Sequence, residues 1–303
     1  MSPDWAENTA QQLLSKNLKQ KGICLILGAS DTGKTTLAEA LAKHLAKNQP
    51  VGIIDADIGQ SHIGPPATVG WAVVDNPLVR AEPAGARQIN FSKLTVGGIS
   101  FVGDITPVGH LLQLTAAIVQ CFQRISKLTE LIIIDTPGFV RGPAAAALWW
   151  TVQRILQPEL ILAVQRNDEL QCILGGLQSV GHRLERIECP PQMPTKSPQE
   201  RQKYRQNQFN KYFRDSCLYN INLSEVAVQR SRNLSSPQDA LRRNSLISRL
   251  VALRDGKGVD IAIGQVKDWQ CDKGVAVVRT QQIDIRQIRC LVIGDITIDI
   301  SDE

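Results

Sequence analysis

The chain has 303 residues, of which 43% are apolar and 21% charged, and its formal net charge is +5. This composition is ordinary for a globular protein, and no window comes near the unbroken apolar run of about eighteen residues that a membrane helix needs. Residues 1–20 carry charged and amide side chains where a signal peptide would have its apolar region. We therefore expect a soluble, cytoplasmic protein with no membrane partner.

The seven cysteines lie far apart in the chain, and none belongs to a C-x-x-C pair. The four histidines are equally scattered. Zinc sites draw their ligands from closely spaced residues of these types, so we expect reduced thiols and no zinc.

The positive charge is concentrated in one segment. Residues 196–254 hold twelve Lys and Arg against four Asp and Glu, so the rest of the chain is slightly acidic. A basic segment beside a nearly neutral body favours contact with a polyanion. A solvated helical surface is the alternative interpretation.

Short apolar runs alternate with helical patterns through the first 190 residues. The runs predict strands at 22–27, 51–57, 99–104, 130–136, 159–165 and 184–189. Helical spacing predicts helices at 34–47, 109–126 and 143–156. This alternation indicates an α/β fold whose parallel sheet is covered by helices on both faces.

Changes in composition divide the chain into parts. Four prolines in residues 190–198 end the α/β pattern, and a helical pattern follows over at least 198–213. From Gly256 onward, short alternating runs are split by Gly and Asp, as in a small β structure. The predicted parts are an N-terminal helical lead-in (1–20), an α/β core (21–190), a basic helical lid (191–255) and a C-terminal β module (256–303).

Residues 28–36, GASDTGKTT, fit the phosphate-loop pattern G-x-x-x-x-G-K-[ST] and lie between a predicted strand and a predicted helix. In this setting, backbone N–H groups and the positive end of the helix surround the phosphates of a nucleotide. Lys34 is expected to reach the β- and γ-phosphate oxygens, and the Thr35 hydroxyl to bind Mg²⁺. The residues predicted to bind the nucleotide are Gly28, Ala29, Ser30, Asp31, Thr32, Gly33, Lys34, Thr35 and Thr36.

Carboxylates follow two of the predicted strands. Asp55 and Asp57 belong to DADIGQ, residues 55–60, and Asp135 belongs to IIIDTPG. A carboxylate at the carboxyl end of a strand beside a phosphate loop can hold Mg²⁺ or accept a proton from an attacking hydroxyl. We prefer Asp57, at the mouth of the site, and regard Asp135 as the competing metal candidate. A turn or helix cap is the alternative role for either residue.

The segment DTPG, residues 135–138, resembles the D-x-x-G switch of GTPases. A GTPase also carries an N-K-x-D guanine selector after a later strand. Residues 163–170, AVQRNDEL, contain no lysine, so guanine specificity is not supported.

Several motifs in chain order resemble those of the polynucleotide 5′-hydroxyl kinase family, whose members include the kinase of the mRNA cleavage factor and the pre-ribosomal RNA processing kinase. The segments that carry the resemblance are GASDTGKTT, DADIGQ, FVGDITPVGH, DTPGFVRG, KSPQERQKYRQNQFNKYF and RCLVIGDITIDI. Together they span roughly residues 22–303. The resemblance implies a P-loop NTPase core, a clasp over residues 136–142, a helical lid and a C-terminal domain.

The resemblance also implies roles for individual residues. Lys34 and Thr35 would bind ATP and Mg²⁺, and Asp57 would orient or deprotonate the acceptor hydroxyl and help to hold the metal. Arg201 and Arg205, four residues apart and therefore on one helix face, would approach the transferring phosphoryl group. The residues implied in the acceptor side, the clasp and the head of the lid are Gln60, Thr106, Pro107, Thr136, Gly138, Phe139, Arg141 and Lys196.

The sequence departs from the family pattern at three points. Phe139 replaces the clasp tryptophan, and it can stack on a base but lacks the indole N–H. Lys196 replaces the arginine that heads the lid, and it cannot make a bidentate phosphate contact. Only about twenty residues precede the first predicted strand, so we expect this chain to lack the N-terminal β domain of larger relatives.

We therefore expect an ATP-dependent kinase that phosphorylates the 5′-hydroxyl end of RNA or DNA. The expected donor and cofactor are ATP and Mg²⁺, and the expected partner is nucleic acid. Two alternatives stay open. One is a phosphate-loop kinase of a nucleoside or small metabolite, and the other is an NTP-hydrolysing switch or maturation factor that signals through DTPG.

Overall fold

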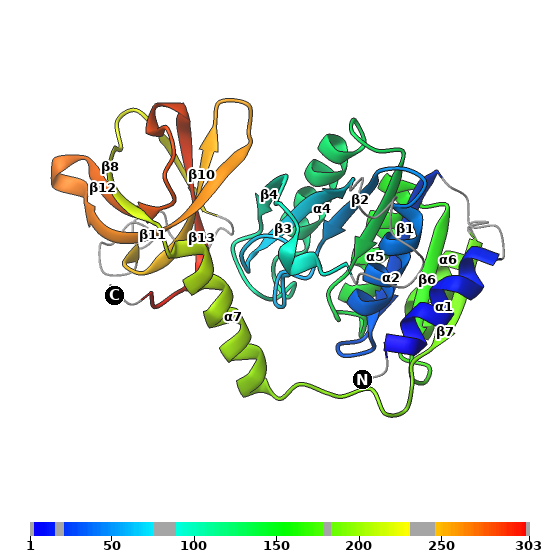
Figure 1. Ribbon diagram of the computed structural model, residues 1–303. Coiled ribbons are helices and arrows are strands. Elements are labelled where there is room, and N and C mark those ends of the chain that lie inside the picture. Colours follow the sequence, from blue (N-terminus) through cyan, green and yellow to red (C-terminus); the bar gives the residue numbers. More distant parts are fainter. Residues whose placement is uncertain (1–2, 16–20, 76–88, 179–182, 231–245, 301–303) are drawn as a thin grey trace.

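Figure 1 shows the computed structural model, which describes residues 3–15, 21–75, 89–178, 183–230 and 246–300. An α/β domain and a β module lie side by side, and a single long helix, α7, leads from one to the other. Among the residues described, no helix has both the length and the apolar character needed to cross a membrane.

The centre of the α/β domain is a seven-stranded sheet in the order β4-β3-β2-β5-β1-β6-β7. Its strands are β1 (Gly22–Gly28), β2 (Val51–Asp55), β3 (Thr68–Val74), β4 (Gly98–Phe101), β5 (Leu131–Asp135), β6 (Leu160–Gln165) and β7 (Arg183–Glu188). Strands β2, β5, β1, β6 and β7 are parallel, so their carboxyl ends meet at one edge of the sheet. Strands β3 and β4 pair antiparallel beyond β2.

The sheet is thus mixed rather than wholly parallel, and β3 was not predicted. The connection from β2 to β3 contains no helix, whereas a parallel crossover usually requires one. The chain therefore turns back on itself and adds two antiparallel strands to the sheet. The glycine and prolines of residues 64–66, just before β3, obscured that strand in the sequence.

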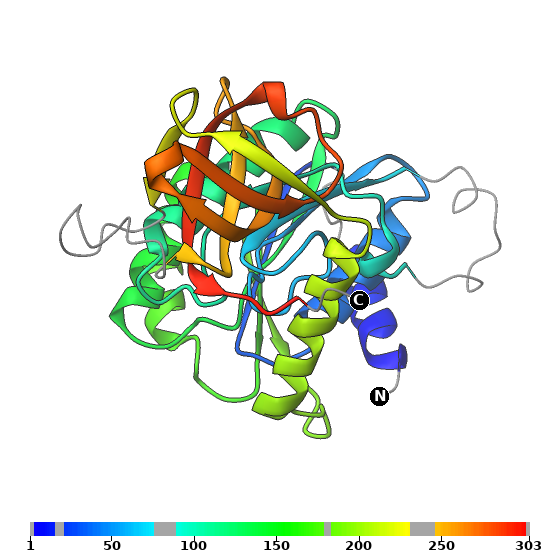
Figure 2. The same ribbon diagram turned by 90° about the vertical axis from the view of Figure 1, so that its left-hand side faces the viewer.

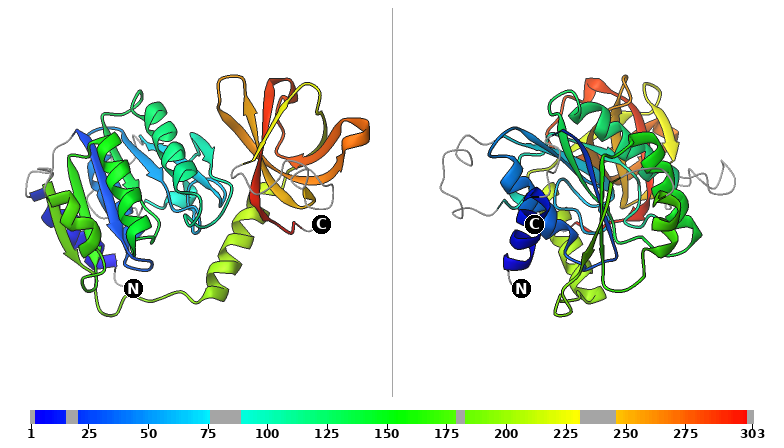
Figure 3. Two further views of the ribbon diagram at one scale, coloured as in Figure 1. Left: turned by 180° about the vertical axis from the view of Figure 1, so that it is seen from behind. Right: turned by 90° about the vertical axis from the view of Figure 1, so that its right-hand side faces the viewer.

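Helices cover both faces of the sheet, as predicted, and Figure 3 shows the blue helices on the face opposite the green ones. One face carries α1 (Pro3–Ser15) and α2 (Lys34–Leu45), and the other carries α4 (Leu111–Ile125), α5 (Pro143–Leu156) and α6 (Gln171–Gln178). The leucines at 37, 41 and 45 are buried against the sheet, which accounts for their helical spacing. The phosphate loop therefore leaves β1 at the carboxyl edge of the sheet and enters α2.

Helix α7 (Pro198–Phe213) occupies the range predicted for the lid helix. It begins with a capping box, in which the Ser197 hydroxyl accepts from the Glu200 N–H and the Glu200 carboxylate accepts from the Ser197 N–H. At its other end, Phe209 and Phe213 are buried in a cluster shared by the β module and β4. Figure 2 shows α7 descending from the β module past the α/β domain. The helix is thus fixed at both ends.

The β module contains a six-stranded sheet in the order β8-β12-β11-β10-β13-β9. Its strands are β8 (Cys217–Asn222), β9 (Ala227–Arg230), β10 (Arg249–Asp255), β11 (Asp260–Gln270), β12 (Val275–Thr280) and β13 (Ile288–Thr297). Three short 3₁₀ helices, η1 (Phe91–Lys93), η2 (Cys271–Lys273) and η3 (Ile285–Gln287), complete the described elements.

The module begins well before residue 256, where we predicted its start, because β8, β9 and β10 belong to its sheet. The basic segment is accordingly not helical throughout, because β8, β9 and the start of β10 follow α7 within it, and its residues 231–245 lie outside the described ones. In β10, Leu250 and Ala252 pack into one core cluster and Val251 and Leu253 into another. A short apolar run that is buried on both faces has no alternation, so its periodicity does not separate strand from helix.

Candidate active site

A pocket of about 670 Å³ lies at the carboxyl edge of the parallel strands, between the α/β domain and the start of α7. Most residues predicted for the site line it: Ser30, Asp31, Gly33, Lys34, Thr35, Thr36, Asp57, Gln60, Thr106, Pro107, Gly138, Phe139, Lys196, Arg201 and Arg205. Pro137, which also lines it, falls within the predicted clasp, and the other lining residues were not predicted: Glu39, Gly59, His62, Asn90, Ser92, Ile105, Met193, Pro194 and Tyr204. The fold therefore brings the phosphate loop, the Asp57 turn, the clasp and the lid to one place.

The phosphate loop is held in shape by its own hydrogen bonds. The Thr32 hydroxyl and the Lys34 ammonium both donate to the carbonyl oxygen of Ala29, at 2.9 and 2.8 Å. Gly28 lies so close to β6 that a Cβ there would stand 2.5 Å from the Val164 carbonyl oxygen. Gly28, Ala29 and Thr32 thus shape the loop and do not line the pocket.

Lys34 is buried at the base of the pocket. Burial lowers its pKa, and the carboxylates of Asp135, Asp57 and Asp31 oppose that shift. An anion that enters the pocket is attracted both by this buried cation and by the positive end of helix α2. The loop is therefore suited to bind phosphate groups.

Thr35 and Asp135 form a pair beside the loop, with the Thr35 hydroxyl donating to Asp135 Oδ2 at 2.5 Å. Asp135 is buried, and its Oδ1 has no hydrogen-bond partner among the described residues. Burial raises the pKa of Asp135 to about 7, the carboxylate of Asp55 adds to the shift, and Lys34 opposes it. An unpaired carboxylate oxygen beside a hydroxyl is the ligand chemistry that Mg²⁺ prefers, so these residues fit the ion.

Asp55 and Asp57 have different environments. Asp55 is fully buried and accepts the backbone N–H groups of Asp57 and of residues 62 and 63, so it fixes the turn after β2. Asp57 lines the pocket, and its Oδ1 accepts the backbone N–H groups of residues 59 and 60. These two bonds fix Oδ1 of a carboxylate that lines the pocket. This environment suits Asp57, rather than Asp55, for contact with a ligand.

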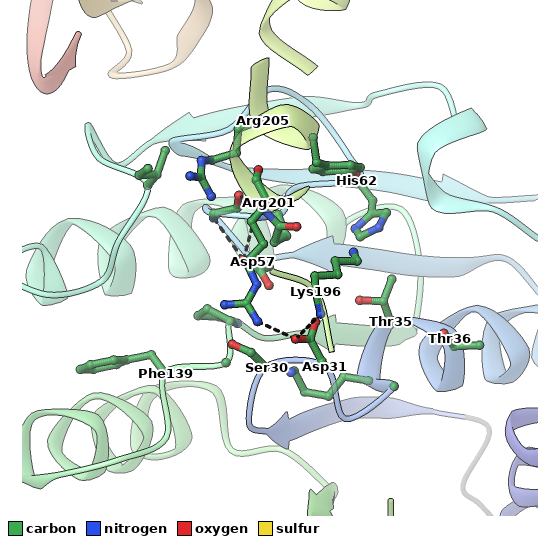
Figure 4. Close-up of a pocket in the computed structure, with 18 of the residues that line it drawn as sticks. Ser30, Asp31, Thr35, Thr36, Asp57, His62, Phe139, Lys196, Arg201 and Arg205 are labelled. Atoms are coloured by element: carbon green, nitrogen blue, oxygen red, sulfur yellow. Dashed lines mark hydrogen bonds and ion pairs between the residues drawn. The ribbon is translucent and has the colours of Figure 1, made fainter. Parts of the chain in front are cut away.

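The lid is attached to the phosphate loop by an ion pair, drawn as a dashed line in Figure 4. Arg201 Nη2 lies 2.5 Å from Asp31 Oδ2, and the backbone N–H of Lys196 donates to the same oxygen at 3.1 Å. One turn further along α7, burial lowers the pKa of Arg205, the charge of Arg201 adds to the shift, and Asp57 opposes it. Two guanidinium groups therefore face the pocket above the loop.

The clasp lies directly on the phosphate loop. A Cβ at Gly138 would stand 2.5 Å from the backbone N of Ser30 and 2.7 Å from its Cα, so only glycine permits this approach. Phe139, which follows, lines the pocket.

Two predicted clasp residues do not reach the pocket. Thr136 is buried, and its hydroxyl donates to the Ile26 carbonyl at 2.6 Å, which ties β5 to β1. Arg141 is exposed and lines a separate pocket of about 300 Å³ together with Asn167 and Cys172. Only part of the predicted clasp therefore lines the pocket.

A glycine-rich loop between β1 and α2, a buried lysine, a Thr–Asp pair and a basic lid over the same pocket define a nucleotide-binding protein of the P-loop NTPase class. Residues 28–215 match the family model described as the P-loop of the mRNA cleavage and polyadenylation factor CLP1. The match covers more than half of the chain, and the chain belongs to this family. The resemblance found in the sequence is thereby confirmed.

Two relatives are similar to this chain over most of its length. The chain is 32% identical over 236 residues to a polyribonucleotide 5′-hydroxyl-kinase of Pyrococcus abyssi. These aligned residues cover 78% of this chain and 63% of the relative. A relative of the same name from Methanocaldococcus jannaschii is 28% identical over 208 residues, which cover 67% of this chain and 54% of the relative. This chain thus spans less than two thirds of the length of either relative.

The fold is similar to that of a solved structure, the wild-type Clp1p–Pcf11p (454–563) complex. The TM-score is 0.68 at 12% sequence identity, and the match covers 97% of this chain and 79% of that chain. The β module is included in this match, as its coverage shows. The comparison therefore supports the α/β core, the lid and the β module as one shared architecture.

Proposed function

We propose that this chain transfers the γ-phosphate of ATP to the 5′-hydroxyl end of RNA or DNA. The observation that carries the proposal is the meeting of Arg201, Asp57 and Lys34 in one pocket, with the phosphate loop on one side and the lid on the other. Phosphoryl transfer leaves the protein mainly the tasks of positioning and of neutralising charge. Relatives named polyribonucleotide 5′-hydroxyl-kinases support the same reaction.

On the donor side, the loop amides and Lys34 bind the β- and γ-phosphates. Thr35, Asp57 and Asp135 are the residues that would hold Mg²⁺, which neutralises phosphate charge when it is bound. Arg201 and Arg205 face the transferred group from the lid. Without these arginines, only Lys34 and the metal would balance the charge that spreads over the γ-phosphoryl oxygens in the transition state.

On the acceptor side, Asp57 is placed to orient the attacking hydroxyl and to accept its proton. Gln60, Thr106 and Pro107 line the pocket near Asp57, and Phe139 offers a ring on which a base can stack. The Gln60 amide donates to its neighbouring carbonyl and to the carbonyl of Arg201 in α7, which links the acceptor side to the lid. We therefore assign the 5′-terminal nucleoside of the acceptor to the side of the pocket lined by these residues.

The direct test uses ATP labelled at its γ-phosphate with 5′-hydroxyl RNA and DNA strands of increasing length, and with free nucleosides. We expect labelled strands and a lower KM for strands than for nucleosides, because a basic lid favours a polyanionic acceptor. Lys34→Ala should abolish transfer. Equal activity on free nucleosides would instead identify a small-molecule kinase, and rapid hydrolysis of GTP or ATP without any labelled strand would identify an NTPase switch.

A further inference from the structure

Among the residues that the structure describes, the β module contributes none to the pocket, because every lining residue precedes β8. Figure 1 shows, however, that β4 lies at the edge of the α/β domain that faces the module. Shortly after β4, residues 104–110 form a segment that we call the acceptor loop. It carries Ile105, Thr106 and Pro107, which line the acceptor side of the pocket. The attachment of this loop to the β module therefore bears on the site.

The acceptor loop packs directly on the turn that holds Asp57. A Cβ at Gly59 would stand 2.9 Å from the carbonyl oxygen of Ile105. Gly59 is the same residue whose N–H donates to Asp57 Oδ1 at 3.1 Å. Within the loop, Asp104 Oδ1 accepts the N–H groups of Ile105 and Thr106, at 2.6 and 3.3 Å. A displacement of the loop would therefore move Thr106 and remove a contact behind the Asp57 turn.

Strand β13 of the β module holds the chain where the acceptor loop begins. The Asp295 N–H donates to the Gly103 carbonyl oxygen at 2.8 Å. Gly294 lies so close that a Cβ there would stand 2.7 Å from the same oxygen. At the start of β11, Asp260 Oδ2 accepts the N–H of Phe101 at 2.8 Å. The module is thus bonded to the backbone just before the loop.

The side chain of Asp295 holds the other end of the loop. His110, the last loop residue, is buried, and its Nε2 lies 3.0 Å from Asp295 Oδ2. A carboxylate only accepts hydrogen bonds, so Nε2 is the donor. The other ring nitrogen, Nδ1, lies 3.2 Å from the Val108 carbonyl oxygen, which directs the same ring toward the backbone of the loop. The Arg249 guanidinium of β10 lies 3.7 Å from Asp295 Oδ1, so both carboxylate oxygens have partners that fix their direction.

We propose that Asp295 is a positioning residue for the acceptor: acting through His110, it holds the acceptor loop against the Asp57 turn and so orders the surface that receives the 5′ end of a strand. The inference rests on the proposed function for the identity of the acceptor. The β module thereby takes part in substrate binding without lining the pocket.

The experiment measures equilibrium binding of fluorescent 5′-hydroxyl strands, of RNA and of DNA in parallel, to the full chain. ATP binding with Mg²⁺ is measured separately, and neither measurement requires phosphoryl transfer. We expect Asp295→Ala to weaken strand binding by about tenfold, the factor that one hydrogen bond to a charged group commonly contributes, and to change ATP affinity by less than about twofold. Asp295→Asn keeps an oxygen for the His110 Nε2–H and should retain most of the strand affinity.

A double-mutant cycle tests the path through His110. His110→Phe removes both ring nitrogens and keeps a ring, and it should weaken strand binding as Asp295→Ala does. The double variant should bind no more weakly than either single variant, because both changes remove the same contact. Should Asp295→Ala fail to fold, Asp295→Asn against His110→Phe gives the same comparison, since only the first of these keeps the hydrogen bond.

Asp260→Asn is the matched control at the same interface. It weakens the carboxylate that holds the Arg254 guanidinium and the Phe101 N–H, and it leaves the contact between Asp295 and His110 in place. This variant should lower the melting temperature and leave strand affinity unchanged.

Unchanged strand binding in both Asp295→Ala and His110→Phe would overturn the inference. Equal losses of strand and ATP affinity would also overturn it, because they indicate a general loosening of the fold. A protein that shows the expected binding losses but phosphorylates no strand keeps this inference and loses the proposed function. A protein that phosphorylates strands and binds them equally in every variant keeps the proposed function and loses this inference.

Discussion

Arg201 of the lid and Asp31 of the phosphate loop form an ion pair, with Nη2 at 2.5 Å from Oδ2. The carbonyl of Asp31 accepts a second guanidinium, that of Arg166 in the loop after β6. Asp31 adopts a left-handed backbone conformation, with φ of 58°. One loop residue thus connects the site that binds phosphate to the lid and to the loop after β6.

Removal of the lid guanidinium should affect the chemical step. We expect Arg201→Ala to lower the rate of phosphoryl transfer by about 10²–10³-fold and to change ATP affinity much less, because an arginine of this kind acts mainly on transition-state charge. Single-turnover transfer and separate ATP-binding measurements distinguish the two effects. Lys203→Ala is the control, because it removes an exposed cation two residues away on the same helix. It should change neither the transfer rate nor the ATP affinity. Full activity in Arg201→Ala would contradict the role given to the lid.

Loss of the ion pair itself should loosen the lid and destabilise the protein only slightly. Arg201 is 32% exposed, so Asp31→Asn should lower the free energy of unfolding by about 0.5–1 kcal/mol. Asparagine retains an oxygen that can accept the Lys196 N–H. Hydrogen exchange in the first turns of α7 should nevertheless become faster, and unchanged exchange there would show that the pair does not hold the lid.

The contact between the clasp and the phosphate loop should tolerate no side chain. In Gly138→Ala, the new Cβ would meet the backbone of Ser30 at 2.5–2.7 Å, so either the loop or the clasp must move. We expect ATP affinity to fall by about tenfold or more, since each 1.4 kcal/mol of distortion is a factor of ten in the binding constant. Gly175→Ala in α6 is the matched control, because nothing lies within 4 Å of its Cβ position. Equal ATP affinity in both variants would contradict the close contact.

The buried carboxylate of Asp135 should make stability depend on pH in the absence of metal. Burial raises the pKa of Asp135 to about 7 from an ordinary value of 3.8, and the charge of Asp55 adds to this shift. The folded protein therefore binds the proton more tightly than the unfolded chain does. This contribution to stability is present below about pH 4 and is lost as the pH rises through 7.

In EDTA, the free energy of unfolding should thus decrease from pH 5 to pH 8, and Asp135→Asn should flatten that decrease. Mg²⁺ should stabilise the unaltered protein more at pH 8 than at pH 5, because the metal binds the ionised carboxylate. Urea unfolding at the two pH values, with and without Mg²⁺, measures both effects. Identical pH profiles in the two proteins would show that Asp135 does not carry the dependence.

The parts of the fold that follow from local pattern could be predicted from the sequence. Helix α5 spans Pro143–Leu156 and α7 spans Pro198–Phe213, the ranges that their spacing and caps indicate. The phosphate loop lies where its motif places it. The strands β8 and β9 were missed because they are short and lie within a basic segment that we predicted to be helical.

The site residues that could be predicted from the sequence are those that belong to motifs. Glu39, His62 and Asn90 belong to no motif, and they come from three separate segments that only the folded chain brings together. Thr136 and Arg141 were expected in the pocket because they belong to the clasp motif, but the Thr136 hydroxyl bonds the Ile26 carbonyl and Arg141 is exposed beside a separate pocket. Spacing along a loop does not fix the direction of its side chains, and that direction decides which residues can touch a substrate.

The central claim concerns the acceptor, and two strands of identical sequence test it most directly, one with a 5′-hydroxyl end and one with a 5′-phosphate. Each is incubated with the protein, Mg²⁺ and ATP labelled at its γ-phosphate, and both the labelled strand and free phosphate are measured. We predict label on the 5′-hydroxyl strand and none on its 5′-phosphate counterpart, with release of free phosphate much slower than transfer. Label on neither strand, together with free phosphate released at the same rate in both reactions, would contradict the account.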